Sequence, residues 1–180
     1  MGNLFIFFRT LILSFSLIGF SFISASLALS AKKNIPSKNL YKATLLADAE
    51  TGRILYQDRI HQENFPASLV KMMVALITIE EINSGRISLK DEVTISSWAS
   101  RIGGHQVYLK QGEKFKLFEL MKATIIGSAN DAAVAVAEHV FGSDKAFIKR
   151  MNFRANELGM KKTQFFSVHG LPPGRNQKID

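Results

Sequence analysis

Residues 65–83, FPASLVKMMVALITIEEIN, predict a helix from about Ser68 to Asn83. The segment is apolar on nearly every side of that helix, and a helix without a polar face belongs in the interior of a domain. The sequence NSGR that follows contains Gly85, which can take the left-handed conformation that ends a helix. We therefore expect this helix to be buried against the remaining elements of the chain.

A serine and a lysine stand at the front of this apolar helix, at positions 68 and 71. Residues three apart lie on one face of a helix, so the amine of Lys71 can reach the hydroxyl of Ser68. Burial lowers the pKa of a lysine, and a partly neutral amine can take the proton of a serine nucleophile. The alternative is that Ser68 is a helix cap and that Lys71 extends to water. The S-x-x-K pattern alone does not decide between them.

A second polar pair lies in IIGSANDAAVA, between two apolar helical runs. Ser128 and Asn130 alternate in this short turn, so both side chains are expected to point into one cleft. On the alternative interpretation, GSAN only breaks one helix and caps the next, which begins at Asp131. The two motifs occur in this order about sixty residues apart, and together they are far more specific than either alone.

The remaining pattern predicts an α+β fold. ATLLADAETGRILYQ indicates an antiparallel hairpin with strands at residues 43–47 and 53–57 and Gly52 in the turn. Short strands are expected at residues 93–95 and 106–109. Two helices should meet at GSAN, and Ser143 is a good N-cap for an amphipathic helix that runs to Leu158.

The first residues of the chain are typical of a secretory signal peptide. Arg9 precedes an apolar run that ends in small residues around Ala28 and Ala31. We expect a signal peptide at residues 1–31 and a domain at residues 32–180. An uncleaved membrane anchor is the alternative, because the run from Leu11 to Leu29 is close to the length that spans a bilayer.

Composition excludes several classes of function. The chain has no cysteine, which rules out disulfides, thiol catalysis and thiolate metal sites. Its net charge of +8 comes from basic residues scattered along the chain without a nucleic-acid motif, so we expect no nucleic-acid partner. The four histidines, His61, His105, His139 and His169, lack metal-ligand spacing, so neither a metal nor a cofactor is expected.

From about Tyr41 to Leu171 the sequence resembles the D-alanyl-D-alanine carboxypeptidases of the S11 serine peptidase family. These are low-molecular-mass penicillin-binding proteins, related to the serine β-lactamases. The resemblance rests on ADAETGRILY, PASLVKMM, GGHQVYLKQGE, GSANDAA and ELGMKKTQFFSVHGL. It implies a penicillin-binding-protein-like transpeptidase fold, with peptidoglycan stem peptides ending in D-Ala-D-Ala as substrates and β-lactams as covalent inhibitors.

The resemblance also implies roles for four residues. Ser68 is the implied nucleophile on the penultimate D-alanine, and Lys71 takes its proton. Ser128 is implied in passing that proton to the leaving amine and in helping water attack the ester. Asn130 is implied in binding the backbone amide of the substrate.

The chain departs from the family pattern in its third motif, K-T-G, which is not found before Asp180. KKTQFF at residues 161–166 is no substitute, because glutamine would crowd a strand position where glycine lets the substrate approach. We therefore expect only the N-terminal part of the fold, without the later sheet strands and the amphipathic anchor, which leaves peripheral membrane association open. His105 is a smaller departure, since the family more often has serine there.

The alternatives to an enzyme are a non-catalytic module that binds stem peptides or penicillin, and an inactive fragment. A β-lactamase is disfavoured, because no ExxLN-like segment follows Asn130 to supply a deacylating glutamate.

Overall fold

The computed structural model describes residues 41–172, which divide into two units. The first unit ends at Gln62 and the second begins at Glu63. The predicted signal peptide lies outside the described residues. Within residues 41–172, no helix combines the length and the apolar character that a bilayer crossing requires.

The first unit contains an antiparallel hairpin of β1 (Thr44–Ala47) and β2 (Ile54–Asp58). Its turn closes where the N–H of Gly52 donates to the carbonyl of Asp48 at 2.9 Å. Gly52 has a φ of +69°, a region that glycine enters without steric cost. The predicted hairpin and its turn residue are therefore confirmed.

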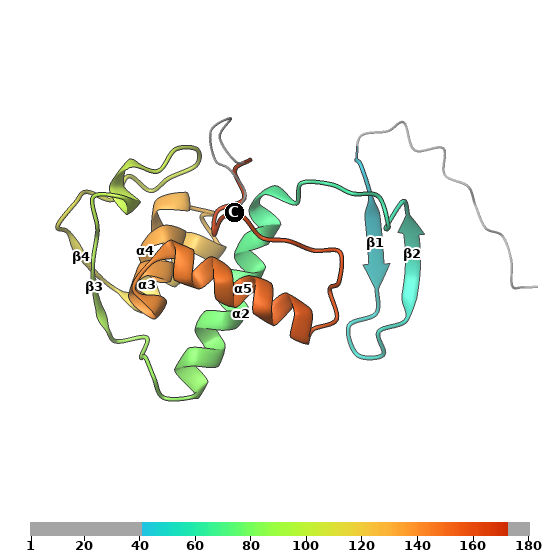
Figure 1. Cartoon of the computed structure of the whole chain (residues 1–180), viewed down its shortest axis with the longest axis horizontal. Helices are drawn as coiled ribbons and strands as arrows, with labels where there is room; N and C mark the ends of the chain where they lie inside the picture. The colour runs from blue at the N-terminus through green and yellow to red at the C-terminus, as the bar shows by residue number, and fades with distance from the viewer. Residues whose placement is uncertain (1–40, 173–180) are drawn as a thin grey trace, which may run out of the picture. The chain divides into compact units, whose positions relative to one another are not determined.

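The second unit packs helices around α4, as Figure 1 shows. The helices are α2 (Val70–Asn83), α3 (Leu117–Ile125), α4 (Asn130–Phe141) and α5 (Asp144–Glu157). α4 contacts the other three helices, and all of its residues from 130 to 137 are buried. Many of these residues are alanines, whose small side chains let the neighbouring helices approach closely. The two helices predicted to meet at GSAN are confirmed as α3 and α4.

Only one face of α2 is buried. Val70, Met73, Val74 and Ile77 lie in the core of the unit. Leu69, Met72, Leu76 and Ile79 are exposed, and their spacing places them along one side of the helix as an apolar stripe. The predicted helix is confirmed, with a 3₁₀ turn at Ala67–Leu69 in front of it and Gly85 at φ +76° behind it. Within the second unit, the expected burial therefore holds for one face of the helix and not for the stripe.

The segment between α2 and α3 differs from its prediction. A strand forms at β3 (Glu92–Thr94), close to the predicted 93–95. Residues 106–109 do not form a strand, and β3 pairs instead with β4 (Lys114–Lys116), which the sequence did not indicate. The N–H groups of Val107 and Leu109 donate to the Asp131 carboxylate, so this segment is held by a side chain rather than by a β-ladder.

α5 begins as predicted, with the hydroxyl of Ser143 accepting the N–H of Ala146 at 3.1 Å. Its Asn152 side chain bonds both backbone groups of Phe165, accepting the N–H at 2.8 Å and donating to the carbonyl at 2.9 Å. This clamp ties the segment after the helix to α5. Residues 161–166 contain no strand.

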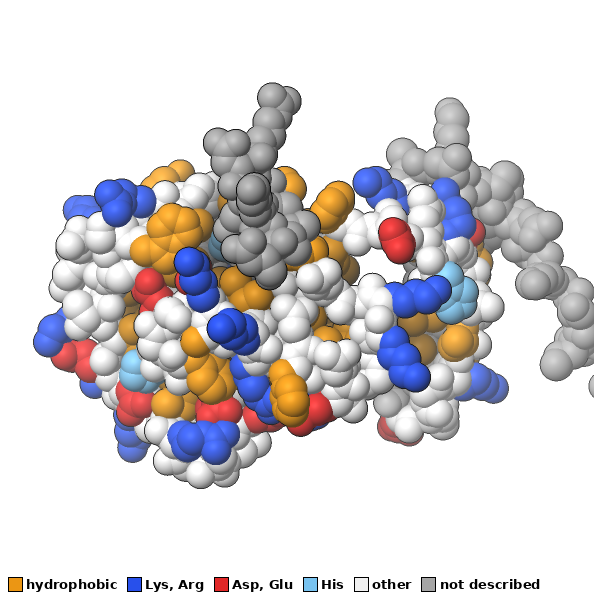
Figure 2. All heavy atoms as spheres, in the orientation of Figure 1, with side chains coloured by type: hydrophobic (Ala, Val, Ile, Leu, Met, Phe, Trp, Pro, Cys, Tyr) orange, Lys and Arg blue, Asp and Glu red, His pale blue; other side chains and the backbone are white. Residues whose placement is uncertain are grey.

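Figure 2 shows Lys and Arg side chains on one face of the molecule, together with acidic and apolar ones. Several form ion pairs with acidic neighbours, among them Arg154 with Glu80 at 2.7 Å and Lys114 with Glu92 at 2.8 Å. These basic side chains are thus partly neutralised by acidic neighbours.

Candidate active site

The amine of Lys71 brings the two polar motifs together. Lys71 lies in the first turn of α2, and its side chain is only 3% exposed. Its Nζ atom is 3.3 Å from the hydroxyl oxygen of Ser68 and 3.4 Å from that of Ser128. The same Nζ donates to Oδ1 of Asn130 at 2.8 Å. The four residues singled out by the sequence therefore meet around one nitrogen atom.

Ser68 reaches this position through a strained turn. It is the middle residue of the 3₁₀ turn Ala67–Leu69, which follows Pro66. Ala67 has a φ of +49°, an unusual value for a residue with a side chain, and such strain is common at active sites. Ser68 is exposed while Lys71 is buried, so a ligand can approach the hydroxyl from solvent as the amine stays within the protein.

Ser128 and Asn130 are fixed by the turn between α3 and α4. Ser128 has a φ of +53°, and the N–H of Ala129 donates back to the carbonyl of Ala123 at 3.0 Å. Gly127 is required there, since a Cβ would lie 2.8 Å from that same carbonyl oxygen. Asn130 is the first residue of α4 and is 3% exposed. The turn is therefore a rigid part of the helical core.

The orientation of the Asn130 amide follows from its other contact. Its Nδ2 donates to the carbonyl of Gly103 at 2.8 Å, so Oδ1 is the atom that faces Lys71. The backbone N–H of Asn130 donates to the carbonyl of His105 at 2.8 Å. Through these two bonds Asn130 joins the 103–109 loop to the site.

A fifth group completes the surroundings of the amine. Nζ of Lys71 donates to the backbone carbonyl of His169 at 3.2 Å, from a residue far along the chain. Burial lowers the pKa of Lys71 from its ordinary value of 10.5. The four described groups that contact the amine are uncharged, so none of these four offsets the cost of burying an ammonium ion.

The contacts of Lys71 can be made by a neutral amine as well as by an ammonium. A neutral amine has two N–H groups and one lone pair, whereas an ammonium has three N–H groups. Oδ1 of Asn130 and the carbonyl of His169 can only accept, so they take both N–H groups of the neutral form. In the neutral form the lone pair is left for the hydroxyl of Ser68 or for that of Ser128, each of which can donate. This arrangement can remove a proton from either serine.

Sequence reasoning missed two parts of the site. The first is the buried carboxylate of Asp131, which accepts the N–H groups of Val107 at 3.2 Å and Leu109 at 3.0 Å. The second is the segment at residues 167–171, whose His169 carbonyl contacts Lys71. The sequence indicated the Asp131 carboxylate only as an acidic residue directly after GSAN, in front of an apolar run. A main-chain contact such as the second leaves no signal in the sequence.

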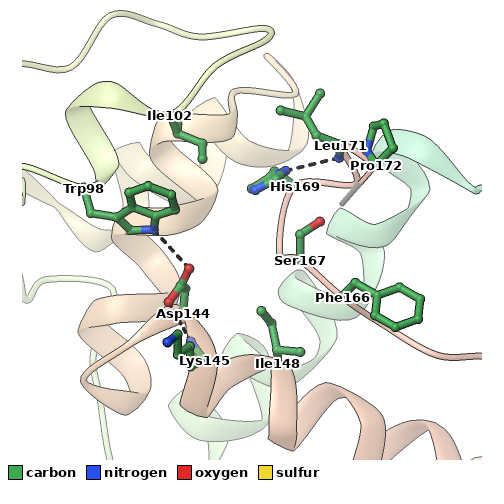
Figure 3. A pocket seen from close by; sticks show the side chains of 10 residues that line it. All are labelled: Trp98, Ile102, Asp144, Lys145, Ile148, Phe166, Ser167, His169, Leu171 and Pro172. Atoms are coloured by element: carbon green, nitrogen blue, oxygen red, sulfur yellow. Dashed lines mark hydrogen bonds between the residues drawn. The ribbon is translucent and has the colours of Figure 1, made fainter. Parts of the chain in front are cut away.

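A cavity of about 480 Å³ lies beside this segment, as Figure 3 shows. Its walls include Trp98, Ile102, Ile148 and Leu171, and the His169 ring faces into it. The indole N–H of Trp98 donates to the Asp144 carboxylate at 3.0 Å across one wall. Among residues 41–172, no three His, Asp or Glu side chains are grouped to hold a metal ion.

Comparisons with known proteins match the chain to one protein family. The sequence profile of peptidase S11, described as D-alanyl-D-alanine carboxypeptidase, matches residues 30–177. The D-alanyl-D-alanine carboxypeptidase DacF of Bacillus subtilis is 39% identical over 130 residues, covering 72% of this chain and 33% of the relative. DacC of Escherichia coli is 34% identical over 164 residues, covering 87% and 41%. The chain thus spans about a third to two-fifths of the length of these relatives.

Solved structures agree with the sequence matches. The D-alanyl-D-alanine carboxypeptidase DacD from Francisella tularensis superposes with a TM-score of 0.71 at 35% identity, covering 74% of this chain and 32% of the other. Penicillin-Binding Protein D2 from Listeria monocytogenes, solved in an ampicillin-bound form, gives a TM-score of 0.64 at 30% identity, with 75% and 55% covered. The described helices and strands therefore form part of a penicillin-binding-protein fold.

Proposed function

The chain belongs to the peptidase S11 family of D-alanyl-D-alanine carboxypeptidases, and we propose that it supplies the nucleophile and base of a serine-type D-Ala-D-Ala carboxypeptidase. In this proposal, the enzyme removes the terminal D-alanine from peptidoglycan stem peptides. Peptidoglycan lies outside the cytoplasmic membrane, which agrees with the signal peptide predicted at residues 1–31. The proposed setting is the periplasm or the outer face of that membrane.

One observation carries the proposal: the buried amine of Lys71 lies within 3.4 Å of both Ser68 and Ser128 while two carbonyl oxygens accept its N–H groups. A serine hydroxyl is a weak nucleophile until a base takes its proton. The lowered pKa of Lys71 brings its neutral form closer to physiological pH, where a base is most effective. Ser68 is the exposed serine of the pair and the better placed to attack a substrate.

The reaction proceeds in two stages. The Ser68 oxygen forms a bond to the carbonyl carbon of the penultimate D-alanine, and its proton moves to the Lys71 amine. The bond to the terminal D-alanine then breaks, and the leaving amine takes a proton through Ser128. In the second stage a water molecule attacks the carbonyl carbon of the Ser68 ester and gives up a proton to the base. The bond from that carbon to the Ser68 oxygen then breaks, the base returns the proton to this oxygen, and the shortened peptide is released.

Asn130 has two tasks in this scheme. Its Oδ1 holds Lys71, and one N–H of its Nδ2 is engaged with Gly103. The second N–H of Nδ2 remains for the backbone carbonyl of a substrate, since an amide nitrogen carries two hydrogens. Substrate binding and orientation of the base thus depend on the same side chain.

β-Lactams are proposed as inhibitors that acylate Ser68. The support is the family, together with a structural relative whose solved form contains ampicillin. A β-lactam carbonyl opened by Ser68 gives the same ester linkage as the peptide substrate.

Labelling with a fluorescent penicillin tests the proposal. The purified chain should acquire a covalent fluorescent band, and Ser68→Ala should abolish it. Ser84→Ala, at the opposite end of α2, is the matched control and should label like the unmodified chain. Release of D-alanine from a synthetic peptide ending in D-Ala-D-Ala then separates an enzyme from a module that only binds. A chain that is folded by circular dichroism and never labels at Ser68 would overturn the proposal.

A further inference from the structure

Residues 167–171, which we call the SVHGL turn, are held by their own side chains. The Ser167 hydroxyl accepts the N–H of Gly170 at 3.0 Å. Nδ1 of His169 accepts the N–H of Leu171 at 3.1 Å, drawn as a dashed line in Figure 3. Two successive backbone N–H groups are thus bonded by acceptors within the turn, and Val168 anchors it in the core at 1% exposure.

The SVHGL turn is also fitted closely to the turn that carries Ser68. Gly170 has a φ of +81°, and a Cβ at this position would collide with the carbonyl of Ala67. On its other side the His169 carbonyl accepts the Lys71 amine at 3.2 Å. A change in the turn therefore reaches both the nucleophile and the base.

We propose that the His169 imidazole is a positioning residue for Lys71, because its Nδ1 holds the turn whose carbonyl orients the amine. The catalytic consequence of orienting the Lys71 amine rests on the proposed function. Its structural part can be tested without any reaction. His169 acts through Lys71 and has no assigned contact with the reacting atoms.

The hydrogen bond between the Leu171 N–H and Nδ1 requires one protonation state of the His169 ring. Nδ1 accepts the Leu171 N–H only when it carries no proton, so the neutral ring has its proton on Nε2. Burial lowers the pKa of His169 below 6.5, and the charge of Lys71 acts in the same direction. Asp144 of α5 acts oppositely, and Lys145 next to it also lines the cavity that the ring faces. Figure 3 shows His169, Asp144 and Lys145 among the side chains that line this cavity.

The sign of the pH effect follows from this lowered pKa. The folded protein favours the neutral ring, so the Nδ1 bond is intact above the ordinary pKa of histidine. The bond is lost as pH falls through the lower pKa of the folded state, because protonated Nδ1 and the Leu171 N–H are both donors. Acid should therefore loosen the SVHGL turn and disturb Lys71.

Two substitutions separate the acceptor from the volume of the ring. His169→Asn keeps an acceptor, because an asparagine Oδ1 bonds the N–H two residues on in an Asx turn. His169→Leu fills space without an acceptor. His61→Leu, at an exposed histidine of the first unit, is the matched control. Loss of one hydrogen bond corresponds to about a fivefold effect.

The first readout is hydrogen exchange at the Leu171 amide, measured by NMR. Exchange should accelerate about fivefold or more in His169→Leu and stay nearly unchanged in His169→Asn and His61→Leu. The ¹⁵N shifts of His169 should show the Nε2–H tautomer. Equal protection in all variants, or a proton on Nδ1, overturns the proposal. This readout holds even if the chain never reacts with penicillin.

The second readout is the rate of penicillin labelling against pH. Protonation of Lys71 should give the logarithm of the rate a slope of one at acid pH, and in the unmodified chain protonation of His169 should add a further fall of about fivefold as the Nδ1 bond is lost. In His169→Asn only Lys71 titrates, so this additional fall should be absent. His169→Leu should be slower at every pH. Identical profiles for the unmodified chain and both His169 variants overturn the proposal, whereas loss of all labelling in the unmodified chain contradicts the proposed function instead.

Discussion

The Lys71 amine lies closer to Oδ1 of Asn130, at 2.8 Å, than to either serine hydroxyl. An amide oxygen accepts a hydrogen bond from an amine in both protonation states and carries no net charge. A carboxylate in the same place would favour the ammonium. The choice of amide over carboxylate therefore helps Lys71 to keep a lowered pKa while it is held in place.

Asn130→Asp should raise the pKa of Lys71 and move the acid limb of penicillin labelling to higher pH. Each unit by which the pKa rises lowers the neutral fraction, and thus the rate at neutral pH, by about tenfold. The measurement is the labelling rate across neutral and alkaline pH. Asn156→Asp, at an exposed position near the end of α5, should leave the profile unchanged. An acid limb at the same pH in Asn130→Asp would contradict the electrostatic argument.

Lys71→Met removes the base and keeps a long apolar side chain. The labelling rate should fall by about a hundred- to ten-thousandfold, the usual contribution of a positioned base. Circular dichroism should still show the helices, because α2 keeps its buried apolar face. Lys110→Met, at an exposed position, is the control and should label normally. Substantial labelling by Lys71→Met would assign the base to another group.

Gly170→Ala should destroy the site while leaving most of the fold intact. The added Cβ meets the Ala67 carbonyl, so the SVHGL turn and the Ser68 turn cannot keep their contact. Gly85→Ala is the matched control, since Gly85 has a similar φ of +76° but open space around it. The control should lose about 1–2 kcal/mol of unfolding free energy from backbone strain alone. Labelling should persist in the control and be lost in Gly170→Ala.

Asp131→Ala should lower stability and free the 106–109 segment. The buried carboxylate bonds the N–H groups of Val107 and Leu109, and removal leaves both without this acceptor. The expected loss is about 3 kcal/mol in the free energy of unfolding, measured by urea denaturation. Glu92→Ala removes an acid from an exposed ion pair with Lys114 and should leave the stability nearly unchanged. Equal effects of the two substitutions would exclude the proposed role of Asp131.

Local patterns predicted the fold where the contacts are local. The hairpin turn at Gly52, the N-cap at Ser143 and the approach of Lys71 to Ser68 each depend on residues a few positions apart, and the structure contains all three. The meeting of Ser128 and Asn130 with Lys71 is long-range, and the resemblance to a family indicated it rather than spacing alone.

The errors arose where tertiary contacts replaced the local pattern. Residues 106–109 have strand-like composition, but their N–H groups bond the Asp131 carboxylate. The apolar stripe of α2 is exposed although its composition favours burial. The His169 carbonyl was missed because every residue carries such an acceptor, and only folding decides which one meets Lys71.

The contact between Lys71 and the SVHGL turn limits how this chemistry can be transplanted. A protein engineer who moves the Ser68–Lys71 helix into another scaffold would carry the nucleophile and the amine but not the carbonyl that lies 98 positions further along the chain. Such a graft would keep the S-x-x-K motif and lose one of the acceptors that orient the Lys71 amine. The unit to transplant therefore comprises the turn of Ser68 and the SVHGL turn, which pack together at Gly170, rather than a motif in one helix.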